Sequence, residues 1–418
     1  MNILRRAALL IFMVIIILFS LAGCNLPTSL SVSPSSQEGN SGGVGAGEGP
    51  AKEAEAGKPE PVVKEETITL TALGDILMHN TLIWAGQQPD GSYRFNFFSA
   101  VQDLIEQGDY STTNLETALA GPETGYTGYP LFNSPDAIAR HLKDSGVDGV
   151  VAANNHLLDR GFSGTQRTVE VLKSAELDTL GTKKSADDHG FLIKDIRGVK
   201  VGYLAYTYGT NGIELPREHS YFINILQREQ ILKDISVLRP QVDVLILVLH
   251  WGVEYSTEPA EEQRSLAREF LGAGVDAIIG SHPHVIQPVE VLNIGGKDKF
   301  VAYSIGNFIG DQDGDERNSG VMVQLKFLQE KLVYPDGTDT DAVHPPRLTE
   351  VLLTPTYSHS YWENGRQQFR VVSVEETIRK IKADEEKILT SQDLPVLENV
   401  LRATQERLGM TYRKFNTK

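Results

Sequence analysis

Apolar residues along this chain form short continuous runs that alternate with longer amphipathic stretches. Runs rich in β-branched residues are typical of buried strands, and they occur at Thr67–Leu73, Gly149–Ala153, Val199–Tyr206, Val242–Leu249, Val275–Ile279, Phe300–Ile305 and Gly320–Phe327. Stretches with helical periodicity lie between them, at Phe97–Gln107, Ser134–Gly146, Gly164–Ala175, Gln227–Leu238 and Glu261–Leu271. Ser134 and Pro135 suit the N-cap and the first position of their helix. This alternation predicts an α/β layered fold.

The first 24 residues predict export and attachment to a membrane. Arg5 and Arg6 precede the apolar stretch Ala7–Ala22, an arrangement typical of a signal peptide. Residues 21–24, Leu-Ala-Gly-Cys, resemble the bacterial lipobox, in which the cysteine is acylated and becomes the first residue of the mature lipoprotein. Cys24 is the single cysteine, so a disulfide within the chain is excluded. An uncleaved signal anchor is the alternative, since the apolar run approaches the ~18 residues that span a bilayer.

Either form of attachment places the body of the protein outside the cytoplasmic membrane, tethered to its outer face. Residues 25–65 are rich in Ser, Gly, Pro, Glu and Ala and contain few large apolar residues. Such a composition cannot offset its ordering entropy by burial, so we expect a disordered tether. The net charge of −16 argues against nucleic acid as a partner, because nucleic-acid binding needs a basic face.

Polar residues of the kinds that bind metals follow several of the predicted strands. In chain order they are Asp75 and His79, Asn114 and Glu116, Asn155, His156 and Asp159, His250, His282 and His284, and Asn307. The carboxyl ends of strands in open α/β sheets form the ligand crevice, so these segments can converge on one edge. Carboxylate, amide oxygen and imidazole are ligands of Zn, Mn and Fe. The pattern therefore predicts a metal site without thiol ligands.

Each cluster also has a plain structural explanation. Gly74-Asp75 suits an ordinary turn, and Asn155-His156 suits an Asx-type turn. His250 can be a hydrogen-bonded core histidine, and Glu116 a salt-bridge partner at the rim. The joint occurrence of suitable ligands at successive strand ends favours the metal site. The other histidines show no such placement, and we expect them to be surface or packing residues: His141, His189, His219, His344 and His359.

The order of these motifs resembles the CapA family of bacterial capsule-synthesis proteins, which includes poly-γ-glutamate synthesis accessory proteins. The motifs are GD, NLE, NNHxxDxG, HWG, GSHPHVxQP and YSxGNF, and they lie between Thr67 and Lys326. The resemblance implies a metallo-dependent phosphatase-like fold, a two-sheet sandwich flanked by helices, in residues 66–330. Residues 331–418 lie outside the motifs, and we expect an extension that packs on the domain, adds edge strands and ends in a helix near Val374–Leu389.

The resemblance also implies roles for individual residues. The metal ligands would be Asp75, Glu116, Asn155, His250, His282 and His284. His156 would assist the leaving group, oriented by Asp159, while His79, Asn114 and Asn307 would be further residues of the site. The implied cofactor is one or two divalent ions of Mn, Zn or Fe.

Two departures from the superfamily pattern bear on activity. The first superfamily motif is Asp-x-His, whereas Asp75-Ile76-Leu77 stands here and His79 is four residues from Asp75. The superfamily motif GDxxD is absent, and Asn114-Leu115-Glu116 stands in its place. The number of metals and the presence of catalysis therefore stay open.

Three functions are consistent with these residues. The first is a membrane-tethered capsule or poly-γ-glutamate assembly factor with a metal-dependent hydrolase-like site. The second is a metal-dependent phosphoesterase for another extracytoplasmic substrate. The third is a non-catalytic scaffold. The implied partners are an anionic polymer such as poly-γ-glutamate, membrane synthase subunits, and the membrane itself through the lipid anchor.

Overall fold

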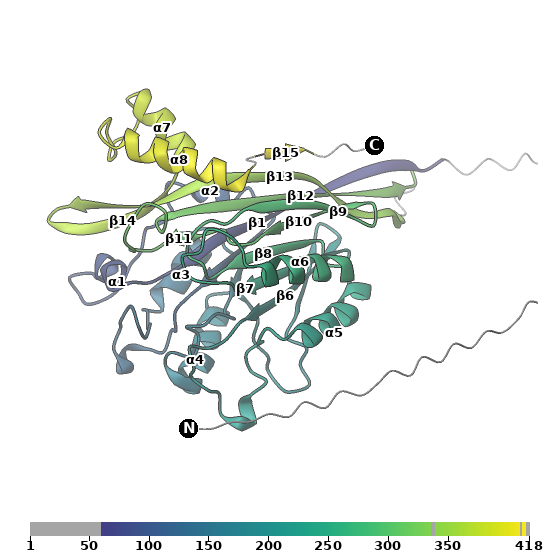
Figure 1. Cartoon of the computed structure of the whole chain (residues 1–418), viewed down its shortest axis with the longest axis horizontal. Helices are drawn as coiled ribbons and strands as arrows, with labels where there is room; N and C mark the ends of the chain where they lie inside the picture. Colours follow the sequence, from purple (N-terminus) through teal and green to yellow (C-terminus); the bar gives the residue numbers. More distant parts are fainter. Residues whose placement is uncertain (1–59, 336–338, 410–411, 415–418) are drawn as a thin grey trace, which may run out of the picture. The chain divides into compact units, whose positions relative to one another are not determined.

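Two β-sheets lie face to face at the centre of the fold (Figure 1). The computed structural model describes residues 60–335, 339–409 and 412–414. The larger sheet has the order β14-β13-β12-β1-β2-β3-β4, with β11 paired to β1 and β15 to β13. Its strands are β1 (Val62–Ile76), β2 (Tyr110–Leu115), β3 (Gly149–Val151), β4 (Asp178–Leu180), β11 (Asn307–Ile309), β12 (Ser319–Val333), β13 (Asp339–Glu363), β14 (Arg366–Ser373) and β15 (Tyr412–Lys414).

The smaller sheet has the order β5-β6-β7-β8-β10-β9. Its strands are β5 (Leu192–Ile196), β6 (Val199–Thr207), β7 (Val244–His250), β8 (Ala277–Ser281), β9 (Val289–Ile294) and β10 (Lys297–Ala302). Parallel pairing joins β1, β2, β3 and β4 in one sheet, and β6, β7, β8 and β10 in the other. The carboxyl ends of these strands therefore share one edge within each sheet.

Strand β7 shows why the sequence forms two apolar layers. Val244, Ile246 and Val248 face the core between the sheets, whereas alternate residues such as Leu245 and Leu247 face an outer cluster. That outer cluster includes residues of α5 (Arg228–Leu238) and α6 (Glu261–Ala273). Side chains on both faces of the strand are buried, which explains the continuous apolar run. Each fully buried Val, Leu or Ile contributes roughly 1.5–3 kcal/mol.

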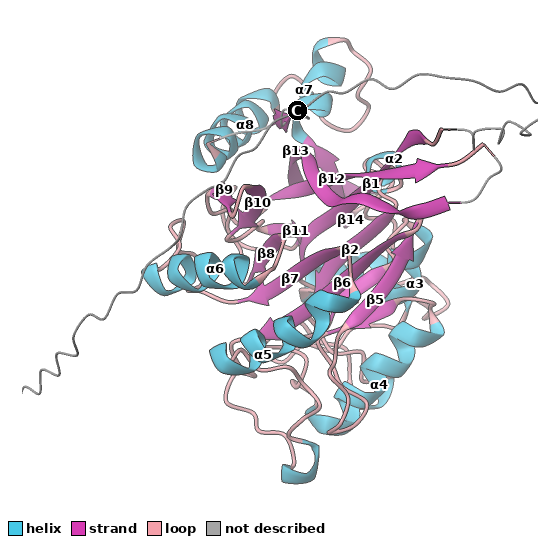
Figure 2. Cartoon of the chain, turned by 90° about the vertical axis from the view of Figure 1, so that its right-hand side faces the viewer, coloured by secondary structure: helices cyan, strands magenta, loops and turns pink. Residues whose placement is uncertain are grey.

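Helices cover the outer faces of both sheets (Figure 2). The larger sheet packs through Leu73 and Ile76 against a cluster that contains Leu82, Ile138 and Leu172. These three residues lie in α1 (Asn80–Gly86), α3 (Ala137–Asp144) and α4 (Gly161–Ser174). Near the C-terminus α7 (Val374–Lys382) and α8 (Leu394–Leu408) pack against β13. The remaining short elements are α2 (Gln102–Ile105) and three 3₁₀ turns, η1 (Pro122–Thr124), η2 (Arg217–His219) and η3 (Arg239–Gln241). The predicted α/β class with two sheets flanked by helices is confirmed.

Two predicted helices are shorter than the sequence pattern indicates. The helix predicted over 97–107 is reduced to α2, because the Phe97 backbone has partners elsewhere: its N–H donates to His141 Nε2 and its carbonyl accepts from the Val371 N–H. The helix predicted over 134–146 is α3, with Asp136 rather than Ser134 at its N-cap. The Ser134 hydroxyl instead pairs with the Thr117 hydroxyl at 2.8 Å.

The domain boundaries also differ in detail from the prediction. Strand β1 begins at Val62, where it pairs with Val333 of β12, so residues 62–65 of the expected tether belong to a strand. Beyond residue 330, β13 and β14 extend the larger sheet, with β14 at its edge, in the region where edge strands were expected. The described part of the chain ends in β15 rather than in a helix, because Tyr412–Lys414 pairs with β13. No helix among the described residues is long and apolar enough to cross a membrane. Cys24 and residues 25–59 of the tether lie outside the described residues.

Candidate metal centre

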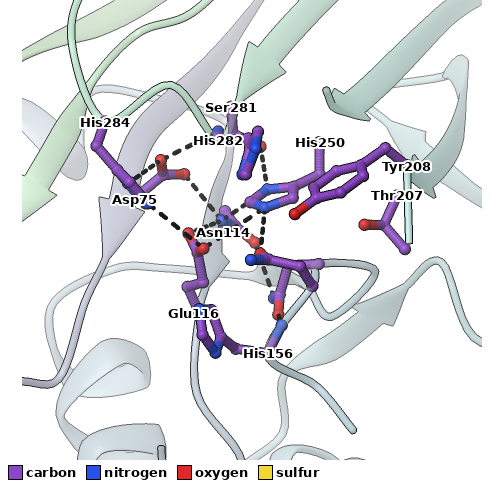
Figure 3. Close-up of polar contacts among 12 residues, drawn as sticks. Asp75, Asn114, Glu116, His156, Thr207, Tyr208, His250, Ser281, His282 and His284 are labelled. Atoms are coloured by element: carbon purple, nitrogen blue, oxygen red, sulfur yellow. Dashed lines mark hydrogen bonds and ion pairs between the residues drawn. The ribbon is translucent and has the colours of Figure 1, made fainter. Parts of the chain in front are cut away.

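The predicted site residues meet where strands of the two sheets end (Figure 3). Asp75 lies one residue before the end of β1, and Glu116 directly follows β2. His250 is the last residue of β7, while His282 and His284 follow β8. All five side chains are buried. The fold therefore brings together residues that are more than 200 positions apart in the sequence, as between Asp75 and His284.

Two glycines allow the strands to approach closely beside the site. A Cβ atom on Gly74 would lie 2.3 Å from the carbonyl oxygen of Gly306, and one on Gly280 would lie 1.9 Å from that of Tyr303. Neither separation is possible for a real side chain, so both positions require glycine. Gly74 directly precedes Asp75, and Gly280 lies two residues before His282. The glycines of the Gly-Asp and Gly-Ser-His-Pro-His motifs thus fix the positions of the candidate ligands.

The turn that carries His282 and His284 has an unusual backbone. His282 has a φ of 98° and His284 a φ of 59°, values that favour glycine. Such conformations cost of order 1–3 kcal/mol each and are typical of functional sites. Surrounding groups hold the turn: the His282 N–H donates to Asp75 Oδ2 at 3.3 Å, and the Tyr255 N–H donates to the Pro283 carbonyl at 2.8 Å. The turn places His282 in a ligand group with Glu116 and His250, and His284 in one with Asp75 and Glu116.

The ligand atoms form two overlapping groups that share Glu116. One group contains Glu116, His250 and His282, and the other contains Asp75, Glu116 and His284. Within each group the nitrogen and oxygen atoms lie within 4.8 Å of one another. A carboxylate common to both groups suits a ligand that bridges two ions, as well as a ligand of a single ion.

Two buried atoms in these groups have no hydrogen-bond partner. They are Glu116 Oε1 and His282 Nδ1, and both remain without a partner when all the described residues are considered. Glu116 Oε1 lies 3.5 Å from His250 Nε2 and 3.7 Å from His284 Nε2. Leaving a buried polar atom unsatisfied costs about 1–3 kcal/mol, and more for a charged group. A divalent ion would satisfy both atoms, so the residues present fit such an ion.

The charges of the cluster perturb its ionisable groups. Burial alone would lower the pKa of His284, but the Glu116 and Asp75 carboxylates outweigh burial and raise it to about 9. For His282, burial and the neighbouring His250 lower the pKa to about 3. Burial alone would raise the pKa of the Glu116 carboxyl, but His250 and His284 hold it below its usual range. The cluster thus keeps the Glu116 carboxylate charged and the His282 imidazole neutral at pH 7.

Asn114 connects the acidic residues of the site. Its Nδ2 atom donates to Asp75 Oδ1 at 2.8 Å and to Glu116 Oε2 at 3.2 Å. Its Oδ1 atom accepts from Asn154 Nδ2 at 3.0 Å. Amide groups can bridge two carboxylates without adding charge. Asn114 therefore fixes the separation of Asp75 and Glu116.

Asn155 lies on the opposite side of His250 from Ser281. The Oδ1 atom of Asn155 is 2.7 Å from His250 Nε2, and the Ser281 hydroxyl oxygen is 2.9 Å from His250 Nδ1. Asn155 Oδ1 thus contacts a candidate ligand, and the predicted role of Asn155 as a metal ligand stays a prediction. Ser281 was not predicted, because a serine at a strand end is too common to stand out.

His156 lies beside the candidate ligands and pairs with Asp159. Its Nδ1 atom is 2.8 Å from Asp159 Oδ2, which also accepts from the Phe132 N–H at 2.7 Å. Burial alone would lower the pKa of His156. The hydrogen bond to Asp159 and the charge of Glu116 outweigh burial, so that the pKa of His156 lies above its ordinary value. Both residues line a cavity of about 310 Å³ that also contacts Leu131 and Glu254. The pair can hold and deliver a proton at this cavity.

His79 and Asn307 occupy different positions around the site. His79 is in none of the ligand groups formed by the described residues, and its Nδ1 atom accepts from the Asp311 N–H at 3.2 Å. Asn307 Oδ1 lies 3.0 Å from His284 Nδ1. Asn307 thus orients a candidate ligand, whereas His79 does not replace the histidine missing after Asp75.

Sequence reasoning missed Glu254 and Tyr208. Glu254 is exposed and forms a third ligand group with His282 and His284. The Tyr208 ring lies 4.5 Å from the His282 ring and 6.2 Å from the His250 ring. Both residues are in loops, and neither belongs to a recognisable motif. The one feature of the sequence that could have pointed to Glu254 as a candidate ligand is its position four residues after His250.

Comparison with known proteins gives a family match over most of the folded region. The family described as "Bacterial capsule synthesis protein PGA_cap" matches residues 69–312. The capsule biosynthesis protein CapA of Bacillus anthracis is 29% identical over 280 residues, which are 65% of this chain and 66% of that protein. The PGA biosynthesis protein CapA of Bacillus subtilis is 28% identical over 318 residues, 73% of this chain and 79% of that protein. The match thus spans just under two thirds of the first relative.

Solved structures with a similar arrangement include the NAD nucleotidase of Haemophilus influenzae. It is 14% identical to this chain, with a TM-score of 0.41. The aligned region covers 81% of this chain and 63% of that structure.

Proposed function

This chain belongs to the family of bacterial capsule synthesis proteins, and from that membership we propose that it acts in the synthesis or export of a capsule polymer. Poly-γ-glutamate is the polymer we favour. The names of two relatives support this choice, since one is a capsule biosynthesis protein and the other a PGA biosynthesis protein. Membrane synthase subunits are the partners that such a role would require.

The site would act as a metal-dependent hydrolase. The observation that carries this proposal is the pair of buried atoms without hydrogen-bond partners, Glu116 Oε1 and His282 Nδ1, inside a cluster of carboxylates and imidazoles. One or two ions of Mn, Zn or Fe would be held by Asp75, Glu116, Asn155, His250, His282 and His284. When bound, such ions lower the pKa of water and stabilise negative charge on a reacting oxygen.

The side chains around this cluster would supply the remaining functions. His156, held by Asp159 through its Nδ1 atom, would keep a proton on Nε2 and donate it to the leaving group. Asn114 would hold Asp75 and Glu116 at a fixed separation, and Asn307 would orient His284. Tyr208 lies against His250 and His282 and would limit the access of water to them.

We further propose that the protein is anchored to the outer face of the cytoplasmic membrane by a lipid on Cys24. The basic residues and apolar stretch before Cys24 support this location. A capsule polymer assembled at the membrane would then meet the metal centre on the extracytoplasmic side.

The test of the metal-dependent function is the metal content of purified variants. Wild type and His189→Ala should carry the same metal by mass spectrometry, because His189 is exposed and lies outside the ligand groups. His282→Ala should lose most of it, because water replaces an imidazole ligand poorly. Wild-type metal content in His282→Ala would contradict the proposed site.

Activity of the loaded protein then separates the candidate roles. Metal-dependent cleavage of a γ-glutamyl polymer supports the proposed hydrolase. Turnover of phosphodiesters without cleavage of the polymer would favour a phosphoesterase. Bound metal with no turnover of either would favour a scaffold that binds polymer or synthase subunits.

A further inference from the structure

Arg317 lies at the edge of the candidate metal centre, and its guanidinium contacts an aromatic ring but forms no ion pair among the described residues. Its Cζ atom lies over the Tyr255 ring, 4.0 Å from the ring centroid. The same ring lies 6.1 Å from the His284 ring, so Tyr255 is beside both Arg317 and a candidate metal ligand. Within the part of the chain that the structure describes, no ion pair or hydrogen bond from the Arg317 guanidinium occurs.

Three of the four acidic residues just before Arg317 in the sequence have other partners, and the fourth, Asp313, is exposed and forms no ion pair with Arg317 among the described residues. Asp311 accepts from the Thr81 hydroxyl at 2.6 Å, and Asp315 accepts from the Tyr357 hydroxyl at 3.0 Å. Glu316 pairs with Arg407 at 3.0 Å. The local excess of acidic residues in this loop therefore does not neutralise Arg317 by direct pairing.

A chain of hydrogen bonds fixes Arg317 relative to the metal centre. Asn307, whose Oδ1 atom contacts His284, donates from Nδ2 to the Arg317 carbonyl at 2.7 Å and to Gln312 Oε1 at 2.9 Å. Gln312 Nε2 in turn donates to the Tyr255 hydroxyl at 3.4 Å. The backbone of Arg317 and the ring beneath its guanidinium are thus tied to the residue that orients His284.

This placement leaves the hydrogen-bonding capacity of the guanidinium free. A guanidinium that lies over an aromatic ring uses its face for the contact, whereas its N–H donors point outward in its own plane. Those donors match the two oxygens of a carboxylate or a phosphate. The chain carries a net charge of −16, so an anionic substrate needs a local cation to approach the site.

We propose that Arg317 binds an oxyanion group of the substrate beside the metal centre, in a site formed with Tyr255. The inference rests on the proposed function, because it assigns Arg317 to recognition of that same substrate. The oxyanion is a carboxylate if the substrate is a γ-glutamyl polymer and a phosphate if it is a phosphoester. Arg317 is a specificity-determining residue here and takes no part in ligating a metal.

The test compares the binding of two probes to the purified full chain by calorimetry, with and without added chelator. The probes are a γ-linked glutamate trimer and inorganic phosphate. Arg317→Gln removes the charge, and Arg317→Lys keeps the charge but removes the planar guanidinium with its paired N–H donors. Arg140→Gln is the matched control, because Arg140 is an exposed arginine on α3, in the outer helical layer.

Arg317→Gln should weaken binding of one probe or both by about tenfold or more, since hydrogen bonds to charged groups are among the strong ones. Arg317→Lys should fall between Arg317→Gln and wild type, and Arg140→Gln should stay within about twofold of wild type. Loss of binding that is confined to the trimer identifies a carboxylate as the group that Arg317 binds. Loss of binding that is confined to inorganic phosphate identifies the phosphate of a phosphoester.

Equal effects of Arg317→Gln and Arg140→Gln, or no binding of either probe to wild type, would overturn the inference. If Arg317→Gln proves unstable in a thermal melt, Arg317→Lys decides the question, and wild-type affinity in that variant counts against the site. Metal content is a separate readout. Absence of metal from wild type defeats the hydrolase proposal, whereas Arg317-dependent binding in chelator would still support the oxyanion site.

Discussion

Metal binding to the group of Asp75, Glu116 and His284 should strengthen steeply between pH 7 and pH 9, because a metal ion there must displace a proton from His284. In the metal-free protein, burial alone would lower the pKa of His284, but Glu116 and Asp75 raise it to about 9. Both carboxylates lie close to the imidazole of His284: its Nδ1 atom is 3.4 Å from Asp75 Oδ2, and its Nε2 atom is 3.7 Å from Glu116 Oε1. Imidazole binds a metal only in its neutral form.

The size of the effect follows from the distance between the pKa and the working pH. At pH 7, about two units below the pKa, roughly 1% of His284 is neutral, which lowers the apparent affinity about a hundredfold, or about 3 kcal/mol. The affinity should rise about tenfold per pH unit and level off above pH 9. His282, with a pKa of about 3, is already neutral at pH 7 and releases no proton.

Calorimetric titration with Mn²⁺ measures this effect directly. At pH 7, titrations in two buffers with different ionisation enthalpies should show about one proton released per ion bound at this site. The control His189→Ala should show the same proton release, since that side chain lies outside the ligand groups. An affinity that is constant from pH 7 to pH 9, with no proton release, would refute the reasoning about His284.

Further predictions concern catalysis, stability and attachment. His156→Ala should retain wild-type metal content and lose turnover, and Asp159→Asn should reduce turnover at unchanged metal content; joint loss of metal and activity in either variant would place these residues among the ligands. Burial lowers the pKa of His141 to about 4, so the unfolded state takes up a proton first as the pH falls from 6.5. Denaturant unfolding should therefore show a loss of about 3 kcal/mol between pH 6.5 and pH 4. His141→Gln should reduce that loss, and an unchanged pH dependence would assign it to other groups. Cys24→Ser should abolish incorporation of a labelled lipid analogue, because no other thiol exists, and persistent labelling would exclude the lipoprotein assignment. Limited proteolysis should cut first within residues 25–61, and early cuts inside β7 or β8 would contradict the expected tether.

The strands and the placement of the candidate ligands at strand ends were predictable because they follow simple local rules. Strand β7 buries both faces, so its apolar run is continuous and ends at His250. Parallel pairing places successive strand ends at one edge of each sheet, and the packing of the two sheets then brings Asp75 and Glu116 close to His284. The spacing of such polar clusters after apolar runs is visible in the sequence without any knowledge of the tertiary contacts.

Other features depend on contacts that no local pattern shows. Phe97 has a suitable pattern for a helix, yet its backbone bonds with His141 and Val371, which are distant in sequence. Strand β13 contains Pro345 and Pro346, so the sequence predicts strands in this region but not a single strand that runs from Asp339 to Glu363. The ring contact between Arg317 and Tyr255 joins two loops, and single loop residues carry no periodicity.

Anomalous diffraction from crystals of the metal-loaded protein tests the central claim most directly, because it locates the ion independently of activity. Data collected on either side of the absorption edge of the bound metal should give a peak within ligand distance of Glu116, with His250 and His282 or with Asp75 and His284. Peaks in both groups would identify a two-metal centre bridged by Glu116. A fully loaded protein whose anomalous peak lies away from Glu116 would contradict the account.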